Sequence, residues 1–198
     1  MRLAGGLLLP VLAAAALGRA VAQSGNPREV VWGPEFTAGV GATYGNLVGG
    51  DFSGSKAGAG FDANVGVVLR RRWQLWVGYD RTNHGHEDTD GDYVVSNVYF
   101  ESRLMFGNGA RGWTPYAAAR LGRAMASFQG VLGITDKGSG YISGLGAGVL
   151  LPFVGRVHSD VAVHYDRLSH DYGTGGYADA EKGGRLSARA GIRVSTRR

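Results

Sequence analysis

Gly184-Arg185-Leu186-Ser187-Ala188-Arg189-Ala190-Gly191-Ile192-Arg193-Val194 is the stretch that decides the fold of this chain. From Leu186 onward every second residue is apolar, and the residues between are serine, arginine or glycine. Successive side chains of a strand point to opposite faces, so this alternation predicts a strand with one apolar and one charged face. A helix would scatter the same arginines around its surface. Which of the two faces points inward is decided by the rest of the chain.

The same alternation occurs in eight runs. They lie at 36–44, 61–70, 73–80, 94–106, 113–122, 141–153, 157–166 and 184–194. Long connections at 45–58, 83–92, 129–138 and 169–183 alternate with short turns at 71–72, 107–112 and 154–155. This regular exchange of long and short connections indicates an up-and-down barrel with loops on one rim and turns on the other.

Glycines and charges on the polar face indicate that this face points inward. A glycine in a strand that faces water costs backbone entropy and covers nothing, whereas in a narrow lumen it makes room for large neighbours. Positive and negative residues on that face also balance, and charges removed from water need such partners. They are Arg70, Arg103, Arg120, Arg185, Arg189 and Arg193 against Asp62, Asp80, Glu101, Asp160 and Asp166.

Aromatic residues gather at both ends of the apolar face. Phe36, Trp73, Phe106, Trp113 and Phe153 lie at the short-turn end, and Tyr44, Phe61, Tyr79, Tyr141 and Tyr165 at the long-loop end. Two aromatic belts around an aliphatic band are typical of a lipid-facing surface. The predicted fold class is all-β, an eight-stranded antiparallel up-and-down transmembrane β-barrel. A soluble lipocalin-like carrier, with its apolar face inward, is the alternative fold.

The amino terminus predicts export. Arg2, an apolar run at 3–17 and the small residues of Ala20-Val21-Ala22 indicate a signal peptide at 1–22. We expect a periplasmic lead at 23–33, the barrel at 34–194 and a basic tail at 195–198. Both ends of the barrel are expected in the periplasm, with the four long connections outside the cell. The chain has no cysteine and therefore no disulfide framework.

The net charge of +5 does not indicate nucleic-acid binding, because the arginines are spread singly through strand patterns instead of forming a patch. The signal, the strand count and stretches such as Thr114-Pro115-Tyr116-Ala117-Ala118-Ala119-Arg120-Leu121-Gly122 resemble the eight-stranded outer-membrane β-barrels of the outer-membrane protein A, protein X and opacity type. The resemblance implies the cell outer membrane as the location. It also implies outer-membrane lipids, lipopolysaccharide and the barrel-assembly machinery as partners, and a monomer. The chain departs from the family by ending on a basic Ser195-Thr196-Arg197-Arg198 tail in place of a terminal aromatic residue.

Three groups of residues are candidate chemical sites. Asp88, Asp90 and Asp92 alternate in the segment 84–92, as in short calcium-binding loops, but the full twelve-residue loop with a closing glutamate is absent, which favours a solvated acidic loop over weak divalent-cation binding. The pairs His158/Asp160 and His164/Asp166 share a face and resemble half of a hydrolase site, but Ser159 points to the other face.

His170 was compared with the lipid A 3-O-deacylases, barrels that carry a His-x-Ser pair late in the chain. Here Tyr172 stands where the serine would be. We therefore predict no catalytic, cofactor-binding or metal site and no cofactor. The expected function is that of a non-enzymatic outer-membrane barrel with a plugged polar lumen, which serves envelope structure or surface interaction through its loops. A lipid A-modifying hydrolase, a narrow channel and the soluble carrier remain alternatives.

Overall fold

A computed structural model describes residues 35–52, 54–70, 72–85, 92–106, 112–129, 135–171 and 181–196. The predicted signal peptide and lead lie outside these residues, as do positions 197–198 of the predicted tail. The elements are β1 (Glu35–Val48), η1 (Gly50–Phe52), β2 (Gly58–Arg70), β3 (Trp73–Gly85), β4 (Asp92–Met105), β5 (Thr114–Gln129), β6 (Thr135–Val154), β7 (Val157–Asp171) and β8 (Glu181–Ser195). No helix among the described residues is long and apolar enough to cross a membrane.

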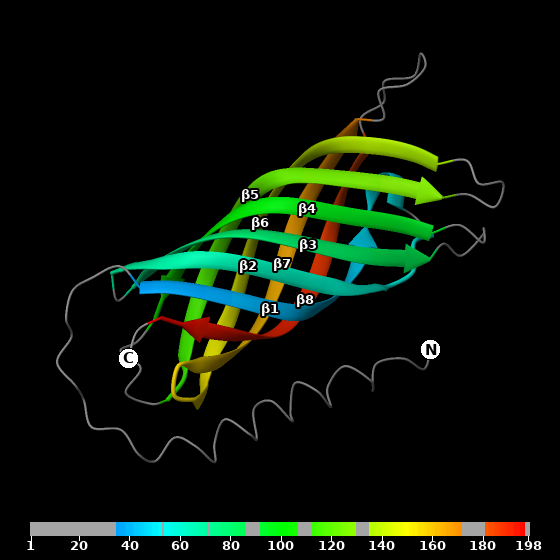
Figure 1. The fold of residues 1–198 in the computed structure, drawn as a ribbon. Coiled ribbons are helices and arrows are strands. Elements are labelled where there is room, and N and C mark those ends of the chain that lie inside the picture. The colour runs from blue at the N-terminus through cyan, green and yellow to red at the C-terminus, as the bar shows by residue number, and fades with distance from the viewer. Residues whose placement is uncertain are drawn as a thin grey trace.

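The eight strands form one closed antiparallel barrel in sequence order. Each strand pairs with the next, and β8 closes the sheet against β1 (Figure 1). Ala42 lies opposite Ala190, and Val40 lies opposite Ile192. Closure removes both sheet edges, so every strand in the wall has two hydrogen-bonded neighbours. The predicted fold class, including the strand count and the order of pairing, is confirmed.

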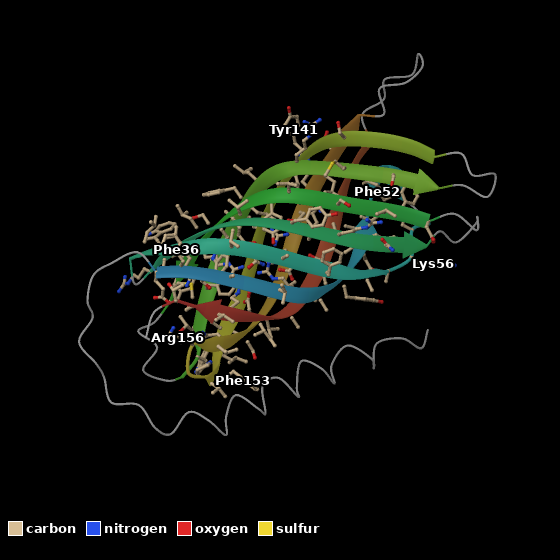
Figure 2. All side chains as sticks on the ribbon, in the orientation of Figure 1. Phe36, Phe52, Lys56, Tyr141, Phe153 and Arg156 are labelled. Atoms are coloured by element: carbon tan, nitrogen blue, oxygen red, sulfur yellow. The ribbon has the colours of Figure 1, made fainter. Side chains whose placement is uncertain are left out.

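The barrel has its apolar side chains on the outer surface and its charged side chains in the lumen. Leu145 is 70% exposed and Val40 65% exposed, whereas Arg185 and Glu101 have no exposed surface. Figure 2 shows Phe36, Tyr141 and Phe153 on the outside of the wall. Apolar side chains in such a continuous outer band cannot be solvated favourably by water, so the wall requires a lipid surrounding. This distribution rules out the lipocalin-like alternative, which needs an apolar interior.

The strands are longer at the loop end than their sequence pattern predicted. β5 and β6 continue to the pair Gln129 and Thr135, and β7 and β8 continue to His170 and Glu181. The predicted loops 45–58, 83–92, 129–138 and 169–183 were therefore too long. Beyond the aromatic belt the outward side chains no longer face lipid, so the apolar alternation fades while backbone pairing continues.

The carboxyl end of the barrel is also one residue longer than predicted. β8 ends at Ser195, which pairs with Thr37. The Thr196 backbone nitrogen then donates to the Phe36 carbonyl oxygen at 2.9 Å. The first two residues of the predicted basic tail are therefore bonded to β1.

Candidate functional site

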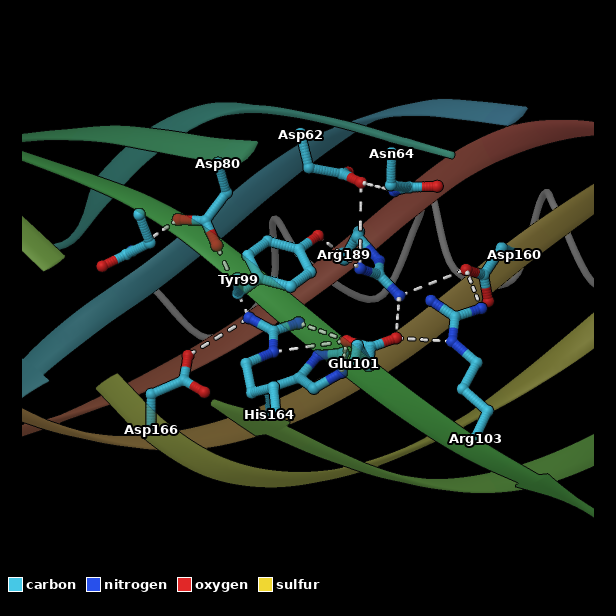
Figure 3. A network of polar contacts seen from close by, with 12 residues as sticks. Asp62, Asn64, Asp80, Tyr99, Glu101, Arg103, Asp160, His164, Asp166 and Arg189 are labelled. Carbon is cyan, nitrogen blue, oxygen red and sulfur yellow. Dashed lines mark hydrogen bonds and ion pairs between the residues drawn. The ribbon is translucent and has the colours of Figure 1, made fainter. Parts of the chain in front are cut away.

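The middle of the lumen holds a network of buried ion pairs, shown in Figure 3. Its members project inward from β2, β3, β4, β5, β7 and β8, and each is at most 4% exposed. The cations are Arg103, Arg120, Arg185, Arg189 and Arg193, and the anions are Asp62, Asp80, Glu101, Asp160 and Asp166. The formal charges of these side chains cancel, which is the condition for keeping so many of them out of water.

Arg185 joins two carboxylates on opposite sides of the lumen. Its Nη1 and Nη2 donate to Oδ1 and Oδ2 of Asp80 at 2.7 and 3.0 Å, a bidentate pairing between β8 and β3. Nη2 also donates to Oδ2 of Asp166 at 2.9 Å, on the adjacent strand β7. Nδ2 of Asn97 also donates to Oδ1 of Asp80, at 2.7 Å. Such charge-assisted forked bonds fix the guanidinium plane as well as its position.

Glu101 is the carboxylate at the centre of the network. Its Oε1 accepts from Nε of Arg103, and its Oε2 accepts from Nη2 of Arg120 at 2.9 Å. Nε2 of His164 lies 3.3 Å from Oε2, and Nη2 of Arg189 lies 3.7 Å from Oε1. Strands β4, β5, β7 and β8 therefore meet at one side chain.

Asp160 is bonded to three arginines at the turn end of the network. Arg193 bonds to it through Nε and Nη2, Arg189 donates to Oδ2 at 3.2 Å and Arg103 donates to the same oxygen at 3.3 Å. The Tyr116 hydroxyl donates to Oδ1 at 2.7 Å. The expected contacts between the β8 arginines and the aspartates of β7 are confirmed.

Aromatic rings stack against the buried guanidinium groups. Arg103 lies between Trp76 and Tyr116, with ring centroids at 4.8 and 4.6 Å. Arg193 lies over the same Trp76 ring, 4.0 Å from its centroid, and Arg120 lies 4.4 Å from the centroid of Tyr99. Trp76, Tyr99 and Tyr116 point inward and are buried. Planar guanidinium groups tolerate such contacts because they are weakly hydrated.

Apolar clusters lie on both sides of the ion pairs, one toward the loop end and one toward the turn end. The loop-end cluster contains Leu47, Phe52, Val95, Ala124, Ile142 and Leu168. The turn-end cluster contains Met105, Tyr116, Ala118 and Ala162, with Leu150 against it. The lumen is therefore layered, with the ion pairs between two apolar clusters.

Phe52 enters the loop-end cluster from the connection between β1 and β2. Gly49, Gly50 and Gly54 flank it with φ angles of 69°, 61° and 85°, a left-handed backbone that other residues rarely adopt. Its ring packs against Gly183 and lies edge-on to Tyr93, with centroids 6.3 Å apart. It is 2% exposed.

The weighed chemical candidates have structural partners. His164 contacts Glu101, whereas its predicted partner Asp166 is bonded to Arg120 and Arg185. His84 is not in a solvated loop: it lies buried in β3, with Nε2 2.9 Å from the Thr82 hydroxyl. Positions 86–91 of the predicted acidic loop, position 172 and the side chains of Arg70 and His170 lie outside the described part of the chain. Within that part, no group of acidic or histidine side chains is arranged to hold a metal ion.

One small space remains beside the network. It has no room for a water molecule and is lined by Asp62, Asn64, Asp160, Arg189 and neighbouring residues of β1 and β8. Oδ1 of Asp62 and Nε of Arg189 have no hydrogen-bond partner there. Each of the five buried carboxylates has an arginine nitrogen within 4 Å, so none is left as a free base.

The fold and its inverted polarity define an eight-stranded transmembrane β-barrel of the kind found in bacterial outer membranes, and this location fits the lipid-facing wall. No protein-family model and no curated protein sequence matches the chain. Solved structures with the same fold do match. Neisserial surface protein A is 19% identical with a TM-score of 0.65, over 82% of this chain and 99% of that one.

Two further structures are similar. The Yersinia pestis attachment invasion locus protein Ail, solved with the heparin analogue sucrose octasulfate, is 20% identical with a TM-score of 0.52, over 81% of this chain and 98% of that one. The outer-membrane protein AlkL, solved in lipid bilayers, is 13% identical with a TM-score of 0.56, over 89% of this chain and 98% of that one. At these identities the likeness establishes the fold.

Proposed function

We propose that this protein is a non-enzymatic outer-membrane barrel with a closed lumen, and that it acts through its wall and its external rim. The layered lumen carries the proposal. In the middle of the lumen, ten charged side chains are paired and at most 4% exposed, and apolar clusters lie on both sides of them. An eight-stranded barrel has an interior that side chains just fill, and here large ones fill it.

Planar-bilayer recording tests the closed lumen. Purified protein inserted into a bilayer should give no steady, resolved conductance steps, because ion passage would require both the ion pairs and the clusters to part. A larger porin in the same membrane controls for insertion and detection. Reproducible unitary steps from the wild-type barrel would contradict the closed lumen and favour the narrow channel.

Lipid A profiles test the absence of enzyme activity. Cells with and without the protein should carry lipid A with the same set of acyl chains, because Tyr172 stands where the compared deacylases carry serine. If lipid A lacks an acyl chain in cells with the wild-type protein and keeps it in cells with the His170→Ala variant, the protein is a lipid hydrolase.

A role at the cell surface is supported by the shape of the loop end. The strands continue beyond the aromatic belt, so the loop end of the barrel extends past the lipid band toward an external partner. Ail, a barrel of the same fold, was solved with a sulfated sugar analogue. We expect a monomer inserted by the barrel-assembly machinery, because closure leaves no strand edge for pairing with a second copy.

A further inference from the structure

Three arginines lie on the outside of the wall at the loop end. Arg81, Arg123 and Arg167 are exposed and project from β3, β5 and β7. Arg81 and Arg167 each follow a residue of the outer aromatic belt, Tyr79 and Tyr165, by two positions. Arg123 is paired across strands with a third belt residue, Tyr141. The three side chains therefore lie within two residues of the outer aromatic belt; we name them the arginine arc.

The arginine arc differs from the buried arginines in having no carboxylate partner. Among the described residues, none of its members makes an ion pair, and Arg123 donates only to the Ser139 hydroxyl, at 3.3 Å. The cross-strand neighbours are uncharged. They are Phe61 and Ser96 for Arg81, Val98 and Tyr141 for Arg123, and Ser143 and Gly184 for Arg167.

Since no carboxylate among the described residues pairs with the arginine arc, its guanidinium groups are open to an anion from outside the chain. The headgroup region is poorer in water than bulk solvent, and guanidinium groups bind phosphate through two parallel donors. Arg123 and Arg167 lie on either side of β6, opposite Tyr141 and Ser143, and the usual strand spacings with this offset put their Cα atoms about 12 Å apart. Tyr141, 78% exposed, and Ser143 lie between them and add a ring and a hydroxyl group.

We propose that the arginine arc binds the phosphate groups of lipid A, the phosphorylated glycolipid of the outer leaflet. The inference goes beyond the proposed function, which concerns the lumen, and rests on the placement of the loop end in the outer leaflet. Glycolipid phosphates fit the arc because they lie at the border between acyl chains and sugar. The exposed Tyr141 ring offers a surface on which that sugar can stack.

Native mass spectrometry of the full barrel in phosphatidylcholine nanodiscs tests the proposal. Lipid A, enzymatically dephosphorylated lipid A and phosphatidylglycerol are titrated in separate arms. Basic side chains at a membrane surface each strengthen binding about fivefold, so R81Q/R123Q/R167Q should weaken lipid A binding about a hundredfold. The matched control is R72Q/R156Q, which removes exposed arginines from the opposite rim and should leave lipid A binding unchanged.

The outcomes separate the possibilities. Weaker binding in the triple variant alone, together with weaker binding of dephosphorylated lipid A to the wild type, supports the proposal. Equal losses in both variants, equal binding of both forms of lipid A, or tighter binding of phosphatidylglycerol would overturn it. Heat-shifted gel mobility verifies folding, and if the triple variant does not fold, R123Q must still lose about fivefold. Bilayer conductance does not enter this test, so a failure here leaves the closed lumen unaffected.

Discussion

Individual residues in the lumen are held by several partners, and the number of partners predicts what their loss will cost. Asp160 accepts from Arg103, Arg189 and Arg193, whereas Arg189 shares two of its three carboxylates, Glu101 and Asp160, with other arginines. Removing Asp160 therefore leaves three guanidinium groups close together, and removing Arg189 leaves only Asp62 without a cation.

We expect Asp160→Ala to lower the free energy of unfolding by about 3–5 kcal/mol, the usual cost of stranding a buried charge. Arg189→Ala should cost less, and the double variant should lose less than the sum of the two. Heat- and urea-dependent gel mobility of the folded barrel measures all three. Arg123→Ala, on the outer wall, is the control and should be close to wild type. Strict additivity, or no loss from either single variant, would show that these groups face water.

Neighbouring strands fit together because glycines lie opposite large inward side chains. Gly66 is paired with Trp76, Gly78 with Tyr99, and Gly148 with Tyr116. A Cβ on any of them would overlap the facing ring. The glycines from which the sequence predicted a lumen therefore leave the space that its aromatic side chains occupy.

Gly78→Ala should lower stability by about 1–3 kcal/mol, because it overpacks the contact with Tyr99. Gly85→Ala lies in the same strand and is the matched control, since its Cβ would meet only the Lys56 side chain at 3.6 Å. Urea unfolding in detergent compares the two. Equal losses would mean that β3 tolerates no alanine for backbone reasons, and the packing explanation would fail.

The outer face of β8 should tolerate a charge only near its ends. Ala190 lies in the middle of the apolar band, opposite Ala42 and Val161. Ala190→Arg should therefore cost about 2–4 kcal/mol of folding free energy in a bilayer, against about 0–1 kcal/mol near the interface. Asn83→Arg, outward but beyond the belt, is the matched control. Equal folding yields in lipid vesicles would contradict the lipid-facing assignment.

The whole barrel has two different ends, and its orientation in the membrane is open to a direct test. Lys56 and Arg156 are exposed at opposite ends (Figure 2). Because the chain has no cysteine, Lys56→Cys and Arg156→Cys each introduce a single thiol. On intact cells an impermeant maleimide should label the first and not the second, and permeabilised cells should show both. The reverse pattern would place the loop end in the periplasm.

The amino-acid sequence by itself determined the strand count, the order of pairing and the face of each residue within the lipid band. A strand places alternate side chains on opposite faces, so one residue of slip would put arginines into lipid. The same alternation identified the buried charges, including Arg189 and Asp160, and their balance identified the lumen.

Only the tertiary structure decided which charges meet across the lumen and where the strands end. Alternation assigns a face but no distance, so the bond from Arg185 of β8 to Asp80 of β3 depends on closure, register and the width of the barrel. His164 was given the wrong partner for the same reason. Phe52 was missed because its burial follows from a glycine-flanked turn that folds back over the open end, and beyond the belt strands continue without apolar alternation. These features depend on residues distant in sequence being brought together, which no local pattern records.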